Sequence, residues 1–139
     1  MKFEKEISYI RDKLYNNIIP RKKYSFIHYE LGPNHVLADK EDNIYLIDID
    51  GMKFFDLEFE HSFLKFRFGE FYRYLQRDDL DQNRMYFYKL YHHIGVLAGA
   101  YHLLQSNYQD LDDVNEMIGY NYNELLKYID TYQEYCKNN

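Results

Sequence analysis

The sequence is poor in several residue types: among its 139 residues there is no tryptophan, one cysteine and two prolines. The single cysteine, Cys136, has no partner for an internal disulfide, so a reducing compartment is expected. No apolar run is long enough to span a bilayer, and the opening residues MKFEKEISYI are too charged for a signal peptide. These absences predict a cytoplasmic protein without a membrane partner.

Positive charge is also scarce, because 17 Lys and Arg stand against 23 Asp and Glu, for a formal net charge of -6. General affinity for nucleic-acid backbones depends on an excess of Lys and Arg. Direct nucleic-acid binding is therefore not expected, and a protein partner with a basic surface is favoured. An oligomer is compatible with this composition.

Aromatic residues supply much of the bulk that is present. They make up 19% of the chain, as 17 Tyr and 10 Phe, within a hydrophobic share of 46%. This is enough for a real core at this length, so we predict a single domain over residues 1–139. The hydroxyl of a buried Tyr needs a hydrogen-bond partner or contact with solvent. The boundary of the core should therefore be amphipathic.

Most of the chain has helical periodicity. The first predicted helix, residues 3–18, has an apolar stripe at spacings of three and four, formed by Phe3, Ile7, Ile10, Leu14 and Ile18. Pro20 is expected to end it. Further helices are predicted over residues 56–68, 70–76, 81–105 and 111–135. Gly119 is a candidate break in the last of these.

Short strands are predicted between the first two helices, and no long strand is expected after Gly51. They cover KYSFIH (23–28), HVLAD (35–39) and IYLIDI (44–49). KEDN (40–43) reads as a hairpin turn, because its residues tolerate left-handed backbone. The fold class is therefore α+β, mainly α-helical, with a small antiparallel β-hairpin.

The hairpin, residues 36–49, is expected to lie on a helical bundle. The predicted core of that bundle comprises Leu64, Phe68, Leu90, Ile94, Leu97, Leu103, Leu104, Leu125 and Ile129.

Histidines and carboxylates are concentrated at the two ends of this hairpin. His28 and Glu30 precede it, and Asp48 and Asp50 follow it. In kinase-type phosphoryl transfer, a catalytic loop supplies an Asp that orients the acceptor hydroxyl, and an Asn five residues on holds Mg²⁺. An Asp beyond the next hairpin binds the metal that bridges the phosphates. The layout here is the same, because hairpin pairing brings the two ends together.

The stretch FIHYELGPNHVLADKEDNIYLIDIDG, residues 26–51, resembles the catalytic and metal-binding core of the aminoglycoside phosphotransferase and choline kinase-like family. That family's loop reads His-Gly-Asp-Leu, three residues and Asn-Val-Leu, followed later by Ile-Asp. HYELGPNHVL and LIDID align with these motifs without a gap. The resemblance spans about residues 20–68. It implies a kinase-like C-terminal lobe in which Glu60 stands where an Asp supports the catalytic loop.

The chain departs from the family pattern at three positions. Tyr29 replaces the Gly, Glu30 the catalytic Asp and His35 the metal-binding Asn, whereas Asp48 keeps the family identity. The extra methylene of Glu30 moves its carboxylate by roughly an ångström, and such a misplacement can cost on the order of 100-fold in rate. Imidazole is a poor substitute ligand, because Mg²⁺ prefers oxygen.

Carried over by position, the resemblance implies Glu30 and His28 as catalytic residues. It implies Asp48, His35 and Asp50 as metal ligands, with Mg²⁺ and ATP as cofactors if the chain is active. Asn34, one place early, would replace His35 only if the loop shifts register.

A nucleotide lobe is not expected in this chain. Only about 20 residues precede the first predicted strand, and they form one helix. Kinase-like enzymes cover the nucleotide with an N-terminal lobe that carries a strand Lys and a Gly-containing loop. We therefore predict that the chain resembles the C-terminal lobe alone.

Three functions remain open. The first is a degenerate, non-catalytic module that binds a protein or ligand, one version being an acidic inhibitor of a basic, nucleic-acid-binding partner. It needs no cofactor. The second is an active phosphotransferase that acts on a hydroxylated small molecule. The third is a Zn²⁺ or Mn²⁺ site built from His28, Glu30, His35 and Asp48.

Each of these residues also has a purely structural interpretation. His28 can brace its loop through the backbone, and Glu30 and His35 can be solvated loop residues. Asp48 and Asp50 flank a glycine turn, where Asp is common. The acids of DLEFE, residues 56–60, are expected to face the dipole of a helix start.

Overall fold

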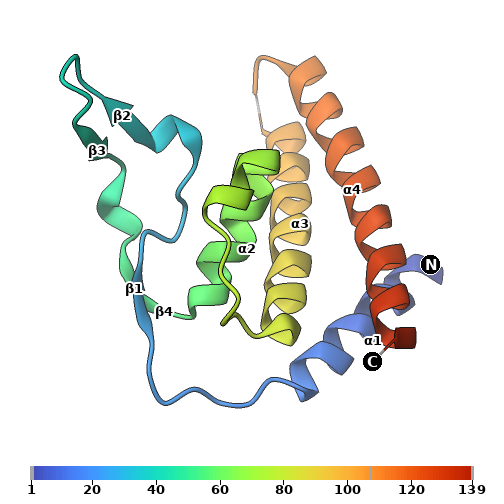
Figure 1. The fold of residues 1–139 in the computed structure, drawn as a ribbon. Helices are drawn as coiled ribbons and strands as arrows, with labels where there is room; N and C mark the ends of the chain where they lie inside the picture. The colour runs from blue at the N-terminus through green and yellow to red at the C-terminus, as the bar shows by residue number, and fades with distance from the viewer. Residues whose placement is uncertain (1, 107, 139) are drawn as a thin grey trace. The chain divides into compact units, whose positions relative to one another are not determined.

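The computed structural model describes residues 2–106 and 108–138, with the side chains of residues 4–106 and 108–137 (Figure 1). The chain groups into two compact units. Residues 14–89 form one, and residues up to 13 together with those from 90 onward form the other. The single domain over residues 1–139 stays a prediction. No helix in the described ranges is both long and apolar enough to cross a membrane.

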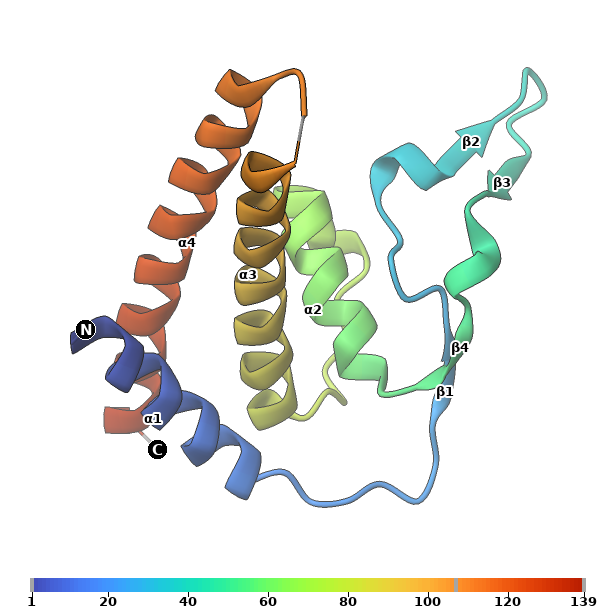
Figure 2. The ribbon, with the colours of Figure 1, turned by 180° about the vertical axis from the view of Figure 1, so that it is seen from behind.

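All the strands of the described chain lie in the unit of residues 14–89, as two antiparallel pairs (Figure 2). β1 (Ser25–Ile27) pairs with β4 (Lys53–Phe55), so that Phe26 is opposite Phe54. β2 (Val36–Ala38) pairs with β3 (Ile44–Leu46), and Leu37 is opposite Tyr45. The second pair is the predicted hairpin.

Helical turns connect and follow these strands. Two short 3-10 helices flank the hairpin, η1 (Pro33–His35) before it and η2 (Ile49–Gly51) after it. α2 (Leu57–Phe68) follows β4 and ends at Gly69, whose φ of 54° favours glycine. A longer 3-10 helix, η3 (Gly69–Tyr74), follows α2 directly.

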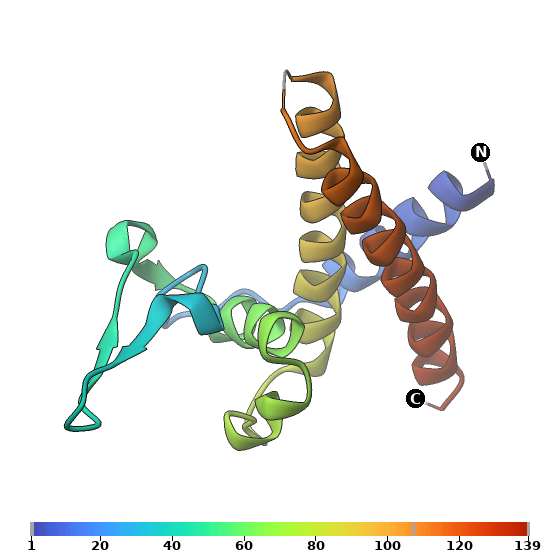
Figure 3. The ribbon, with the colours of Figure 1, turned by 90° about the horizontal axis from the view of Figure 1, so that it is seen from above.

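The second unit contains α4 (Leu111–Asn138), α1 (Lys2–Asn16) as far as residue 13, and α3 (Gln82–Gln105) from residue 90. Within this unit, the ring centroid of Tyr128 on α4 lies 6.1 Å from that of His93 on α3. Figure 3 shows α1 crossing α4, where Gln133 donates a hydrogen bond to Glu6. Its buried hydrophobic residues are Ile10, Leu90, Ala100, Val114, Leu125, Tyr128, Ile129 and Tyr132.

The predicted helices are confirmed, with differences at their ends. α1 ends at Asn16, before Pro20. The segment predicted as a helix over residues 70–76 forms the 3-10 helix η3. Gly119 does not break α4, because glycine costs a helix interior only about 1 kcal/mol relative to alanine. The predicted stripe on α1 is buried at Ile10 and Leu14, whereas the side chain of Phe3 lies outside the described residues.

The predicted core is partly correct. Four of its residues are buried: Leu64, Leu90, Leu125 and Ile129. Four are half-buried: Phe68, Leu97, Leu103 and Leu104. The prediction that Ile94 belongs to the core was wrong, since its side chain is 39% exposed. The buried positions beside it on α3 are His92 and His93. Helical periodicity alone predicted the apolar Ile94 as the core residue in place of the two polar histidines.

One short strand was not identified from the sequence. Lys53–Phe55 forms β4, and its partner β1 lies far back in the sequence, so no local pattern indicates the pairing. The position of the hairpin on a helical bundle stays a prediction, and several of its apolar side chains are exposed. Leu37, Ile44, Tyr45 and Leu46 are 49%, 63%, 53% and 46% exposed.

Candidate functional site

The hairpin turn is organised by one carboxylate, Asp39. Its Oδ1 accepts hydrogen bonds from the backbone N–H groups of Glu41 and Asn43, and its Oδ2 accepts from the Asn43 amide and the Tyr45 hydroxyl. These hydrogen bonds, led by the Asn43 side chain, lower the pKa of Asp39. Asp42 has a φ of 61°, as its predicted left-handed tolerance requires.

The two ends of the hairpin meet through His28, His35 and Asp48. His28 is buried directly after β1, and its Nε2 lies 3.0 Å from the carbonyl oxygen of Ile47. The rings of His28 and His35 are stacked, with centroids 5.7 Å apart. Nε2 of His35 lies 3.5 Å from Oδ2 of Asp48. The structure thus brings together three of the five predicted site residues.

One ring nitrogen of each imidazole, Nδ1, makes no hydrogen bond to the described residues. Nδ1 of His28 and Nδ1 of His35 are buried and have no hydrogen-bond partner within the part of the chain that the structure describes. The contact of His28 with the Ile47 carbonyl joins the loop after β1 to the end of β3, which is the bracing role expected from its structural interpretation.

Tyr29 occupies the family's glycine position and has a backbone conformation that is typical of glycine. Its φ is 82°, in the left-handed region. Its N–H donates a 2.8 Å hydrogen bond to Oε2 of Glu60, so the predicted support of this loop by Glu60 is confirmed. Burial raises the pKa of Glu60, and the Tyr29 N–H partly opposes that rise. The ammonium of Lys53 lies 3.3 Å from the Tyr29 ring centroid, a contact that sequence analysis missed.

The other predicted residues stand apart from this cluster. Glu30 and Asp50 are exposed, and within residues 4–106 and 108–137 no hydrogen bond or ion pair involves either side chain. The amide oxygen of Asn34 accepts a 2.6 Å hydrogen bond from Arg67, and among the described residues no hydrogen bond joins Asn34 to Asp48. No register shift therefore brings an amide to the metal position.

The donor set does not fit Mg²⁺. Among the described side chains, no group of three or more His, Cys, Asp and Glu is placed to hold a metal ion. At the position of the family's amide oxygen, His35 presents a nitrogen to Asp48, whereas Mg²⁺ requires near-octahedral oxygen ligands. The catalytic and metal-binding roles of these residues stay predictions.

A buried ionic network lies behind the loop and was missed by sequence analysis. Asp56 and Glu58, interpreted as helix-start charges, are 3% and 1% exposed. Asp56 pairs with Arg84, and Glu58 pairs with Arg21. Arg84 also donates to the carbonyl oxygen of Ile19, and so ties the segment before β1 to the start of α2. No local pattern predicts these pairs, because their members are far apart in sequence.

This combination of a loop, a hairpin ending in Asp48 and a following set of helices is a kinase-like arrangement. Among solved structures, the crystal structure of spectinomycin phosphotransferase APH(9)-Ia in complex with ADP and spectinomycin is similar to this chain. The TM-score is 0.62 at 20% sequence identity. The similarity confirms the predicted aminoglycoside phosphotransferase-like fold.

The chain covers less than half of that protein. The match includes 85% of this chain and 41% of the spectinomycin phosphotransferase chain, which is consistent with the C-terminal lobe expected from the resemblance. No protein-family model and no curated protein matches the sequence.

Proposed function

We propose that this chain is a kinase-like module without efficient phosphoryl transfer, which acts by binding a protein or a ligand. The contact between His35 and Asp48 carries the proposal. A nitrogen base lies 3.5 Å from the carboxylate at the position where the family places an amide oxygen beside a metal ion. Asp48 therefore lacks the second oxygen ligand that Mg²⁺ prefers.

The loop before the hairpin supports the same function. Glu30 replaces the family's shorter Asp and is exposed. Tyr29 adds a ring where the family has a glycine, and that ring is held by Phe59 and Lys53. A loop anchored by a side chain has less freedom to close on a substrate than a loop with glycine.

The surface that would bind a partner is the hairpin surface, which we define as residues 36–50. Six of its large apolar side chains are exposed: Leu37, Ile44, Tyr45, Leu46, Ile47 and Ile49. Its charged residues are mostly acidic: Asp39, Glu41, Asp42, Asp48 and Asp50, with Lys40 as the one basic residue. Apolar area beside carboxylates suits a protein whose surface is apolar and basic. An acidic inhibitor of a basic, nucleic-acid-binding protein is one form of this function.

Catalysis is tested with the purified chain, ATP or GTP, Mg²⁺ and a panel of hydroxylated small molecules that includes spectinomycin. We expect no phosphate transfer and no nucleotide-dependent rise in melting temperature. Turnover that is lost in both Glu30→Gln and Asp48→Asn would overturn the proposal.

Binding is tested with a peptide of alternating Leu and Lys and a matched peptide of Leu and Glu. We expect only the Lys peptide to bind, and the triple variant E41Q/D48N/D50N to weaken it by about tenfold. The matched control is D112N/D113N/E116Q, which removes three carboxylates from α4 and should leave affinity unchanged. Equal loss in both triple variants would mean that net charge, and not the hairpin surface, binds the peptide.

An active phosphotransferase is the second candidate. It is favoured by the similarity to an enzyme crystallised with ADP and spectinomycin and by the 60% exposure of the Asp48 side chain. Glu30 would accept the substrate proton, His28 would brace the loop, and Asp48 would hold the metal, with His35 or Asp50 as an auxiliary. The variant E30D/H35N restores the family residues and should bind Mg²⁺ and nucleotide more tightly than the native chain. Unchanged nucleotide binding in this variant would leave the second candidate without support.

A further inference from the structure

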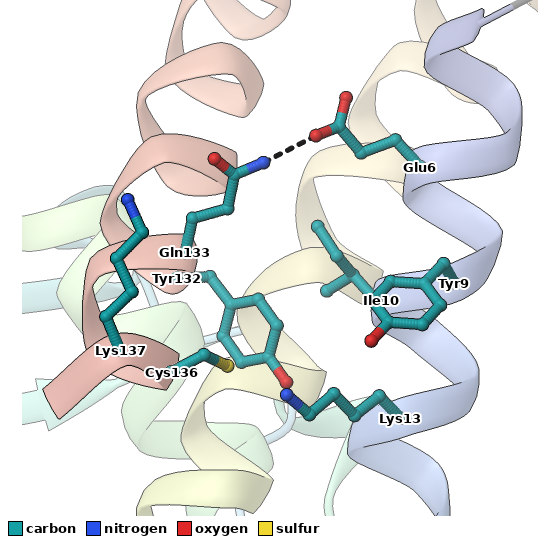
Figure 4. Close-up of a pocket in the computed structure, with 8 residues that line it drawn as sticks. All are labelled: Glu6, Tyr9, Ile10, Lys13, Tyr132, Gln133, Cys136 and Lys137. Atoms are coloured by element: carbon teal, nitrogen blue, oxygen red, sulfur yellow. Dashed lines mark hydrogen bonds between the residues drawn. The ribbon is translucent and has the colours of Figure 1, made fainter. Parts of the chain in front are cut away.

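A pocket of about 290 Å³ lies between α1 and α4 (Figure 4). Every residue that lines it belongs to the unit formed by residues up to 13 and from 90 onward. From α1 come Glu6, Tyr9, Ile10 and Lys13, and from α4 come Tyr132, Gln133, Cys136 and Lys137. None of them belongs to the hairpin surface, so the inference below does not depend on the proposed function.

The base of the pocket is apolar and aromatic. Ile10 and Tyr132 are only 2% and 3% exposed, and the ring of Tyr9 stands at the more open side, 66% exposed. Burial raises the pKa of the Tyr132 hydroxyl, so this group is neutral at physiological pH. Two tyrosine rings and an aliphatic side chain form walls suited to a flat aromatic ligand.

The rim of the pocket is cationic. Lys13 extends from α1 toward the Tyr132 hydroxyl in Figure 4, and Lys137 stands on the α4 side. Glu6 is the one carboxylate among the lining residues, and it accepts a 2.5 Å hydrogen bond from Gln133. Asp12, next to Lys13 in sequence, is paired with Arg11. No ion pair to a described residue neutralises either lysine.

We infer that this pocket binds a small aromatic carboxylate. The ring system would lie between Tyr9 and Tyr132 against Ile10, the carboxylate would face Lys13, and Lys137, on the α4 side of the rim, would add attraction at longer range. The volume is just below the range of about 300–1,000 Å³ found for ligand sites, which suits one or two fused rings. Ammonium groups form charge-assisted hydrogen bonds with a carboxylate, and they repel a cationic ligand of the same shape.

The chemical test compares three probes of one shape: 2-naphthoate, 2-naphthalenemethanol and 2-naphthylmethylamine. Cys136 is the only cysteine in the chain and lines the pocket, so its alkylation by neutral iodoacetamide reports occupancy. We expect 2-naphthoate to slow alkylation saturably, with an affinity about tenfold or more above those of the alcohol and the amine. Equal protection by all three probes, or protection by none, would overturn the inference.

The genetic test removes the two cations. K13Q/K137Q should weaken 2-naphthoate binding by about tenfold or more, whereas K13R/K137R should keep it within about threefold, because the charge is retained. The matched control is K127Q on α4, whose lysine pairs with Glu124 outside the pocket and whose loss should leave affinity unchanged. If K13Q/K137Q loses helical circular dichroism, K137Q alone is measured, with a loss of about threefold expected. Wild-type affinity in the folded Gln variant would overturn the inference.

Discussion

The ring of Tyr29 lies flat on the ring of Phe59, with centroids 4.4 Å apart and planes 8° from parallel. The backbone of Tyr29 has a φ of 82°, a conformation that costs a residue with a Cβ about 1–2 kcal/mol. The stacking, with the Lys53 ammonium near the same ring, offsets this cost. The chain thereby keeps a glycine-like loop geometry without the glycine.

Substitutions of Tyr29 should reverse the usual order of alanine and glycine. Tyr29→Ala loses the ring contacts and keeps the backbone strain, so its free energy of unfolding should fall by about 2 kcal/mol. Tyr29→Gly should lose about 1 kcal/mol less, because glycine adopts a positive φ freely. Urea denaturation measures both. At Tyr45, in β3, alanine should be the more stable of the two, and the same order at both positions would contradict the argument.

Arg84 should not be replaceable by lysine. Its guanidinium binds both the Asp56 carboxylate and the Ile19 carbonyl oxygen, and a single ammonium lacks that fork. We expect Arg84→Lys to lower the free energy of unfolding by about 1–2 kcal/mol and Arg84→Ala by about 3–5 kcal/mol, since Asp56 is then left buried and poorly paired.

The control for this prediction is Arg77→Lys, whose exposed pair with Asp79 should contribute almost nothing to stability. Guanidinium denaturation distinguishes the two positions. A similar, small effect at Arg84 and Arg77 would show that the network does not hold the segment before β1.

Glu60 should make stability depend on pH. Burial raises the pKa of Glu60 above 4.5, so the folded protein keeps a proton that the unfolded chain has released. The free energy of unfolding should therefore fall as the pH rises from about 4.5 through the raised pKa. Glu60→Gln does not titrate and can still accept the Tyr29 N–H.

Thermal denaturation at about pH 4 and about pH 7 measures this effect. The stability of Glu60→Gln relative to the native chain should increase with pH. Glu70→Gln, at an exposed carboxylate, should show no such trend. A constant difference between the native chain and Glu60→Gln across this range would contradict the prediction.

Asp39 should keep the hairpin structurally ordered. Its pKa is lowered by its hydrogen bonds, so its contribution is present above 3.8 and is lost as the pH falls through the lowered value. Asp39→Ala removes the acceptor of four hydrogen bonds and should speed amide exchange across residues 39–46. Glu41→Ala, in the same turn, is the control, because the Glu41 backbone and not its carboxylate bonds Asp39. Equal exchange in both variants would contradict this role.

Much of the candidate site was predictable because its signals are local. The turn residues 40–43 and the β-branched strands around them predicted the hairpin, and the motif around His28 and Asp48 predicted which ends meet. The pairing of His35 with Asp48 needed the structure, since sequence shows the substitution at position 35 but not the direction of its ring. The exposure of the hairpin could also be seen only in the structure, because an alternating apolar pattern does not indicate whether other elements cover the apolar residues.

By itself, the amino-acid sequence determined the helices and the hairpin, because helical periodicity and turn chemistry act over a few residues. The kinase-like class of fold was predicted from the resemblance of the motifs around His28 and Asp48 to a known family. Only the tertiary structure decided that Lys53–Phe55 pairs with β1, that Asp56 and Glu58 are buried against arginines, and that α1 and α4 enclose a cationic pocket. Each of these depends on side chains or backbone groups far apart in the chain, and their meeting is set by packing and by the need to pair buried charge.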